Sequence, residues 1–203
     1  MLENSVYFYP MPKITPRQLH RRIALWIALP LLFIALTGAT YRIGRSWFGM
    51  SKSTGNEILH LHTGGWWGEL GSQIYLAIIG GLFLFLIFSG LRVWFTSRSA
   101  NTPVRRLHRL LGILFSLPLI VSTITGLAYR LGEKRLAEST LDFLMVLHQG
   151  DWLGKTLRPY YILLLVTSVL AFTVTGLLML WRSRSTRNNN VSMPVPQFPR
   201  LKK

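Results

Sequence analysis

Residues 17–44 read RQLHRRIALWIALPLLFIALTGATYRIG and place one histidine among arginines at the start of a long apolar run. Three further apolar runs of similar length carry almost no charge. Each run is long enough to cross a hydrocarbon core of roughly 30 Å at about 1.5 Å per helical residue. The sequence therefore predicts an all-α membrane protein with four transmembrane helices. They are expected at about 16–42, 66–95, 103–130 and 159–182.

The same stretch recurs later in the chain. Residues 105–132 read RRLHRLLGILFSLPLIVSTITGLAYRLG, and a shift of 88 residues gives 12 identities in 28 ungapped positions. Apolar composition alone would match Leu with Ile, but it would not align a His, a Pro, a Thr-Gly and a Tyr-Arg in one register. The stretch that predicts the first helix is therefore half of an internal duplication.

The second arm of each predicted hairpin repeats at a shift of 86 residues, where LHTGGWWG around His62 matches LHQGDWLG around His148. We therefore predict two tandem two-helix repeats, residues 15–98 and 99–184. Because each repeat crosses the membrane twice, both enter it in the same orientation. The expected pseudo-twofold axis runs along the membrane normal.

Charge predicts the topology of this chain. Of its 23 Lys and Arg residues, 15 lie in the N-terminal segment, the loop at 92–109 and the tail from residue 182. Six of the seven acidic residues lie in the 42–73 and 130–158 loops. By the positive-inside rule both termini are cytoplasmic, and the two loops of about 30 residues face outward. The net charge of +16 is thus attributed to topology and anionic lipid, and no nucleic-acid partner is expected.

The ends of the chain give weaker signals. The segment 1–14 is expected to be cytoplasmic and not a removable signal peptide, because the apolar run after it is too long for one. The tail 185–203 is basic and rich in Asn and Pro, so it is expected to be disordered or to order on a partner. The predicted location is a bacterial inner membrane or a thylakoid membrane. The chain has no cysteine, which excludes disulfides and thiolate metal sites.

Helix starts can be predicted locally. Thr15-Pro16 and Thr102-Pro103 each offer an N-cap residue followed by a proline at the first helical position. Arg158-Pro159 is predicted to open the fourth helix in the same way.

Four of the five histidines are matched between the repeats: His20 with His108, and His62 with His148. Neutral imidazole is a good iron ligand, and a b-type haem needs two of them on opposite faces. The topology places the first pair on the cytoplasmic side and the second on the outer side. The sequence therefore predicts two haem b groups, one near each leaflet, with these four histidines as axial ligands.

Other residues are secondary candidates. His60 aligns with Val146 and is the alternative outer ligand. Four arginines are matched between the repeats at helix ends and are candidate contacts for haem propionates, which are carboxylates. They are Arg42, Arg130, Arg21 and Arg109. An interfacial anchor would explain each of these arginines equally well, and His60 could simply be an exposed loop residue.

The motifs LHRLLG, LHTG or LHQG and TGLLMLW resemble the PepSY-associated transmembrane helix family over about residues 15–185. The resemblance implies a four-helix core that binds two b haems and passes electrons to extracytoplasmic ferric complexes. By position, the implied ligands are His20, His62, His108 and His148. The predicted outer loops are too short for the PepSY domains of typical members, and the first repeat reads LHRRIA instead of LHRLLG.

The predicted function is a dihaem b-type membrane cytochrome, either a ferric-reductase-like protein or a redox subunit that depends on a partner. Whether the chain is itself an enzyme stays open, and its electron donor and acceptor are unidentified. No flavin or nicotinamide motif is present, so electrons are expected from a partner or larger complex, with the basic tail as a docking segment. The alternatives are a non-redox accessory subunit and a pigment-binding subunit. A transporter is disfavoured because no acidic residue lies within an apolar run.

Overall fold

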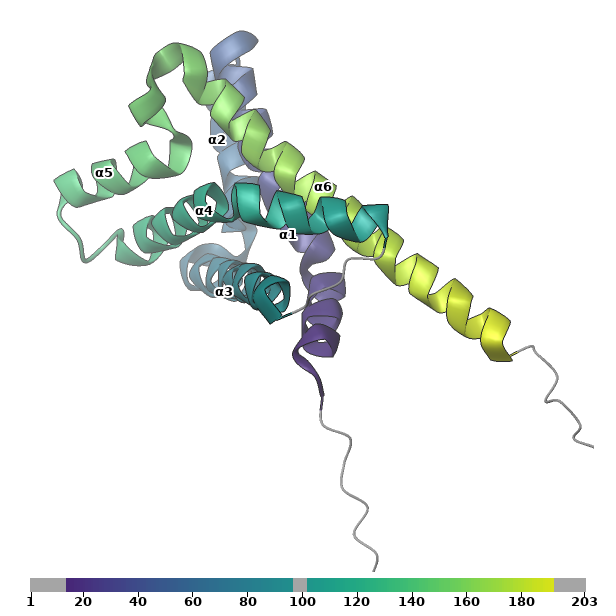
Figure 1. The fold of residues 1–203 in the computed structure, drawn as a ribbon. Helices are drawn as coiled ribbons and strands as arrows, with labels where there is room; N and C mark the ends of the chain where they lie inside the picture. The colour runs from purple at the N-terminus through teal and green to yellow at the C-terminus, as the bar shows by residue number, and fades with distance from the viewer. Residues whose placement is uncertain (1–13, 97–101, 192–203) are drawn as a thin grey trace, which may run out of the picture.

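The computed structural model of the chain describes residues 14–96 and 102–191, with side chains as far as Arg182. All secondary structure in these residues is helical (Figure 1). Six α-helices follow one another, with a short 3₁₀ turn before α3 (η1, Gly65–Trp67) and before α6 (η2, Asp151–Leu153). The helices are α1 Pro16–Trp47, α2 Lys52–Thr63, α3 Gly68–Thr96, α4 Pro103–Gly132, α5 Glu138–Gln149 and α6 Gly154–Val191.

Four helical stretches are long and apolar enough to cross a membrane. They are Pro16–Trp47, Gly65–Thr96, Pro103–Gly132 and Asp151–Arg182. Large apolar side chains such as Trp26, Leu29 and Leu117 are more than two-thirds exposed, as expected for a surface that faces lipid. The predicted all-α membrane class with four transmembrane helices is therefore confirmed.

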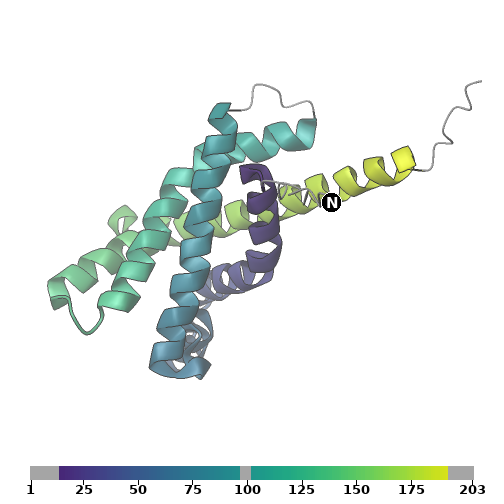
Figure 2. The same ribbon diagram turned by 90° about the horizontal axis from the view of Figure 1, so that it is seen from below.

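The four long helices form a ring. Helix α1 packs against α3 and α6, and α4 packs against the same two helices, so α1 and α4 lie at opposite corners. Figure 2 shows α3 running alongside α4. A hydrophobic core fills the middle of the ring, built from buried side chains of all four helices. These are Ile27, Ile79, Phe83, Leu119, Leu165 and Val169.

The two predicted N-caps are confirmed. The Thr15 hydroxyl accepts a hydrogen bond from the Gln18 backbone N–H, and the Gln18 side chain accepts one from the Thr15 N–H. This reciprocal capping box, with Pro16 as the first helical residue, fixes the start of α1. At α4, Thr102 caps the Arg105 N–H and Pro103 is the first helical residue.

The predicted outer loops differ from the structure, because each contains a 12-residue helix, α2 or α5. Helix α2 packs against α1, and α5 packs against α4. Both are short amphipathic segments interrupted by polar residues, so a search for long apolar runs does not detect them. Helix α2 spans Lys52–Thr63 and α5 spans Glu138–Gln149. The starts of the two helices are 86 residues apart, and so are their ends. This spacing equals the predicted repeat shift, but the pseudo-twofold axis stays a prediction.

Helix α6 also differs from its predicted bounds. It begins at Gly154, and Pro159 lies within it instead of opening it. The proline is fully buried in the second turn, close enough to the start that few backbone hydrogen bonds are lost. At the other end α6 continues to Val191, so residues 185–191 of the predicted disordered tail are helical. Residues 192–203 and nearly all of the segment 1–14 lie outside the described residues.

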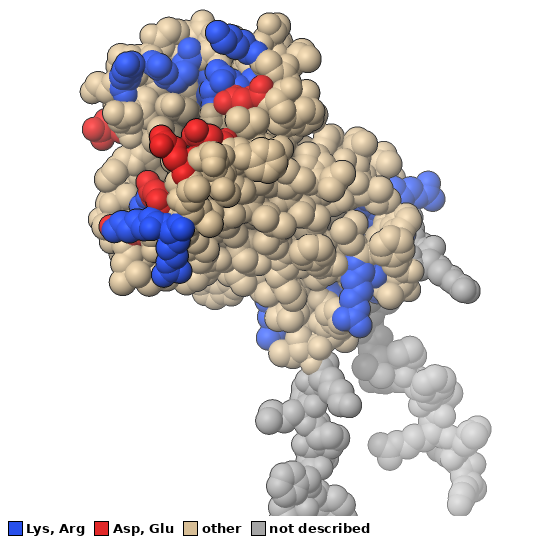
Figure 3. Space-filling view, turned by 90° about the vertical axis from the view of Figure 1, so that its left-hand side faces the viewer, with Lys and Arg blue, Asp and Glu red and all other residues tan. Residues whose placement is uncertain are grey.

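Charged side chains separate along the molecule. On the face shown in Figure 3, acidic residues gather at one end, basic residues occur at both ends, and a broad uncharged belt lies between them. Every described acidic residue lies between Glu57 and Asp151, and Glu69 and Asp151 lie at the starts of the stretches Gly65–Thr96 and Asp151–Arg182. This distribution matches the sequence prediction that one end carries nearly all the acid. It does not establish which end faces the cytoplasm.

Candidate functional site

Helices α2 and α5 each end one residue after a histidine, His62 or His148. Gly64 follows α2 with φ of +69°, and Gly150 follows α5 with φ of +74°. This left-handed conformation strongly favours glycine. It explains the Gly of LHTG and LHQG, which turns the chain sharply so that His62 and His148 stay at the helix ends. A Cβ at either glycine would also contact the Tyr75 or Tyr161 ring within 2.8 Å.

The rings of His62 and His148 face each other at this end of the bundle. Their centroids are 6.5 Å apart, with 51° between the ring planes. A metal bound about 2 Å from a nitrogen of each ring, on opposite sides, would hold the two centroids about 6 Å apart. The pair that the sequence proposed for the outer side is therefore brought together at a spacing that suits two axial ligands.

The tautomer of both rings is set by backbone carbonyls. The Nδ1–H of His62 donates to the Ile34 carbonyl at 2.9 Å, and that of His148 donates to the Ser122 carbonyl at 2.8 Å. A carbonyl can only accept, so the proton is on Nδ1 in each ring and Nε2 keeps its lone pair. In proteins, a metal-ligating histidine is oriented by a hydrogen bond of this kind, donated by the ring nitrogen that does not bind the metal.

Two glycines make room for these rings. A Cβ on Gly38 would lie 2.9 Å from Cε1 of His62, and one on Gly126 would lie 2.7 Å from Cε1 of His148. Real Cβ atoms do not approach other atoms so closely. The Thr37-Gly38 and Thr125-Gly126 matches found in the sequence therefore have a structural reason: each glycine seats a histidine ring against its helix.

Both rings are neutral near pH 7. Burial, together with the neighbouring charge of His148, lowers the pKa of His62 to about 4, although the hydrogen bond to Ile34 acts in the opposite direction. Burial also lowers the pKa of His148, with a further contribution from Arg42. Neutral imidazole is the form that binds metals.

The His62–His148 pair lines a cavity of about 690 Å³ inside the ring. All four long helices contribute to its wall, and its floor is made of core residues such as Phe83, Leu119 and Leu165. A volume of this size is typical of small-molecule and cofactor sites. The wall is mainly apolar, while Tyr41, Tyr129 and several charged residues add polar groups.

His60 lies on the same cavity but is exposed, and its ring packs against the backbone of Gly65. It is not one of the facing pair. The preference for His62 over His60 as a ligand stays a prediction.

Of the four arginine candidates, only Arg42 and Arg130 line this cavity. Arg130 is held by Ser72 and Glu133. Arg42 is 7% exposed, its guanidinium lies 5.8 Å from the centre of the Tyr41 ring, and the charges of Asp151 and Arg158 act on it, but it has no hydrogen bond or ion pair among the described residues. A buried guanidinium in this state favours an anion beside it.

The other two arginines lie at the opposite end. Arg109 donates to the Trp94 carbonyl at 3.3 Å and stacks over the Trp94 ring, which joins α4 to α3. Arg21 is exposed near the start of α1. Neither lines the His62–His148 cavity.

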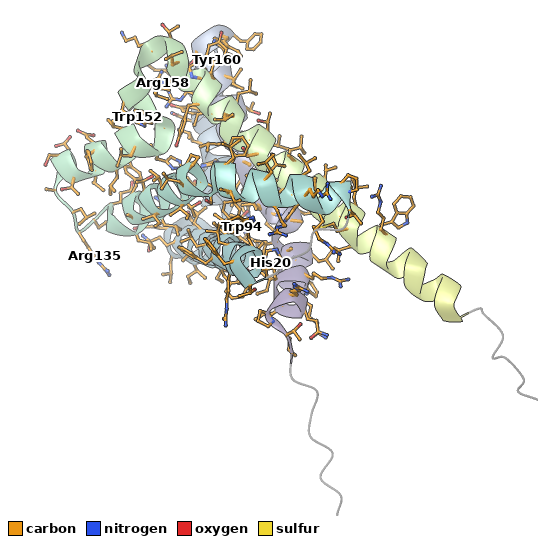
Figure 4. The ribbon with its side chains drawn as sticks, in the orientation of Figure 1. His20, Trp94, Arg135, Trp152, Arg158 and Tyr160 are labelled. Atoms are coloured by element: carbon orange, nitrogen blue, oxygen red, sulfur yellow. The ribbon has the colours of Figure 1, made fainter. Side chains whose placement is uncertain are left out.

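The second histidine pair lies at that same end, because His20 contacts Ser89, five residues before Trp94 on α3; Figure 4 labels His20 and Trp94. His20 comes from α1 and His108 from α4, at opposite corners of the ring. They are close enough for a charge on one to act on the other. Along α1, His20 and the Gly38 that contacts His62 are 18 residues apart, about 27 Å at about 1.5 Å per residue. The two pairs therefore lie at opposite ends of the apolar belt.

Each ring of this pair meets a hydroxyl and a glycine. Nδ1 of His20 is 2.7 Å from the Ser89 hydroxyl, and Nδ1 of His108 is 2.7 Å from the Thr175 hydroxyl. A Cβ on the next residue, Gly90 or Gly176, would lie 3.5 or 3.9 Å from the ring. Ser89 and Thr175 are not among the residues predicted from the sequence. Their signal was available, because a Ser-Gly or Thr-Gly pair recurs in the 86-residue register.

No group of three or more His, Asp or Glu side chains gathers as a metal-ion site in residues 14–96 and 102–182. Within those ranges each histidine pair has two imidazoles, which is the number of axial ligands in a b-type haem with two histidine ligands.

Comparison with known proteins gives one match. The family model described as the PepSY-associated TM region matches residues 50–139. This range contains His62 and His108, while His20 and His148 fall outside it. No curated protein and no solved structure matches the chain. The resemblance predicted from the LHRLLG and LHTG motifs is confirmed over residues 50–139, where the chain is similar to the PepSY-associated TM region.

Proposed function

We propose that the protein is a dihaem b-type membrane cytochrome that carries electrons across the bilayer. The observation that supports this most directly is the facing pair His62 and His148. Both rings are neutral, both have Nδ1 bonded to a carbonyl, and their centroids are 6.5 Å apart at a 690 Å³ cavity. His20 and His108 would hold the second haem at the other end of the belt.

The residues present fit such a group. Gly38 and Gly126 leave space that a Cβ would fill, and the cavity wall is mainly apolar. Arg42 is buried beside the cavity and has no hydrogen-bond partner among the described residues, so it suits a carboxylate. Arg130 lines the same cavity but already has partners, whereas Arg21 and Arg109 are candidates only for the His20–His108 end.

When bound, the two haems would supply reversible one-electron chemistry at iron. The chain's own residues hold the ligand rings at fixed positions through α1, α2, α4 and α5. The core between the pairs, which includes Ile27 and Phe83, excludes water from the space between them. A ferric-reductase-like protein and a redox subunit of a larger complex would both use this arrangement. The electron donor, the electron acceptor and any host complex are part of this proposal.

The test is a reduced-minus-oxidised spectrum of the purified protein, with a haem-to-protein ratio. A ratio of two is expected, and substituting His62→Ala or His108→Ala should each remove one haem. Protein that carries no haem would overturn the proposal. A chlorophyll-type pigment in the extract would instead support the alternative of a pigment-binding subunit.

A further inference from the structure

The two histidine pairs differ in what holds Nδ1. At His62 and His148 the partner is a backbone carbonyl. At His20 and His108 the partner is a side-chain hydroxyl, of Ser89 on α3 and Thr175 on α6. A hydroxyl can donate or accept, so its direction has to be derived from its other contacts.

Both hydroxyls already have an acceptor for their only proton. The Thr175 hydroxyl lies 2.7 Å from the Ala171 carbonyl, and the Ser89 hydroxyl lies 3.2 Å from the Leu86 carbonyl. These carbonyls can only accept. With its proton directed to its own helix, each hydroxyl oxygen accepts from the histidine Nδ1–H, which leaves Nε2 of the ring unprotonated.

We propose that Ser89 and Thr175 are positioning residues for the His20–His108 pair: their hydroxyls fix the Nε2-ligating tautomer and make each ring more electron-rich. The hydrogen bond gives Nδ1–H a partner, and such a bond strengthens the ring as a metal ligand. Each ring also joins two helices, since His20 reaches from α1 to α3 and His108 from α4 to α6. The effect on a bound haem rests on the proposed function, whereas the tautomer does not.

The first experiment determines which histidine ring nitrogens are protonated. It uses ¹⁵N-histidine NMR on the full-length protein in detergent, reduced with dithionite. We expect His20 and His108 to carry a proton on Nδ1 and none on Nε2. An Nε2–H on either ring in haem-free protein would overturn the inference. Absence of haem from the sample would count against the proposed function alone, because the haem-free rings still report their tautomer.

The second experiment is a redox titration of Ser89→Ala and Thr175→Val. A ring that loses its hydrogen bond donates less to iron, so the midpoint potential of one haem should rise while that of the other stays constant. Ser89→Thr and Thr175→Ser keep a hydroxyl and should restore the original value. Unchanged potentials in both hydroxyl-free variants would contradict the inference.

Thr167→Val is the matched control on α6. The Thr167 hydroxyl makes the same kind of bond, to the Leu163 carbonyl at 2.8 Å, but it contacts no histidine among the described residues. This variant should leave both potentials unchanged. If it moves them as much as Thr175→Val does, the effect is a general one of α6 and the inference fails.

Discussion

At the scale of single residues, glycines decide where the histidine rings rest. Gly126 lies under the His148 ring so closely that an added Cβ would be 2.7 Å from Cε1 and 2.8 Å from Nδ1. The neighbouring atoms belong to a ring that is itself bonded to Ser122. It therefore cannot move aside without losing that bond.

We therefore predict that Gly126→Ala displaces the His148 ring and lowers haem content by up to one equivalent per protein. The loss should come from the haem that His62→Ala also removes. Gly112→Ala is the control, because a Cβ at Gly112 on the same helix would have nothing within 4 Å. Equal haem content in the two variants, measured by pyridine haemochrome, would contradict the prediction.

His60 and His62 supply a second test at this scale. They lie two residues apart on α2, yet only His62 faces His148. His60→Ala is expected to keep both haems, and His62→Ala is expected to lose one, as measured by the haem-to-protein ratio. The opposite pattern would make His60 the ligand.

The sequence predicts these residues unevenly. Matching between the two halves selected the four histidines and the Thr-Gly pairs, because identical residues in one register are visible without a structure. It did not show that Gly38 touches His62, or that Ser89 touches His20. Those contacts join helices that are distant in the sequence, so they depend on packing that no local pattern encodes.

At the scale of helices, α2 and α5 carry His62 and His148 and depend on left-handed glycines at their ends. In Gly150→Ala, a Cβ would both strain a φ of +74° and lie 2.4 Å from Cδ1 of Tyr161. The backbone strain alone costs about 1–2 kcal/mol. We expect at least that loss in the free energy of unfolding in detergent. Gly81→Ala is the control, because a Cβ at Gly81 on α3 would have nothing within 4 Å. Its free energy of unfolding should fall far less.

The two short helices also show where sequence patterns stop being informative. Long apolar runs predicted all four transmembrane helices, and Thr-Pro pairs predicted two of their starts. Helices α2 and α5 have 12 residues each and a polar face, so only their packing on α1 and α4 makes them stable. The predicted start of the fourth helix at Pro159 was wrong, because helix had already formed at Gly154.

At the scale of the whole molecule, the absence of cysteine allows a direct test of orientation. Lys52→Cys at the start of α2 and Thr96→Cys at the end of α3 place single thiols at exposed positions on opposite ends. By the positive-inside rule, a membrane-impermeant maleimide added to intact cells should label the first and not the second. Labelling of Thr96→Cys alone would reverse the predicted topology.

The length of α6 has a consequence for what surrounds the protein. At about 1.5 Å per residue, its 38 residues extend about 57 Å, whereas a bilayer with its head groups measures about 40–45 Å. A tilt of ordinary size shortens the projection by only a few ångströms. The part of α6 beyond Arg182, about 14 Å long, extends the helix past the candidate membrane span at the end that carries His20 and His108 (Figure 1). With both termini cytoplasmic, as the sequence predicts, a cytoplasmic protein that docks at this end would contact this helical extension of α6.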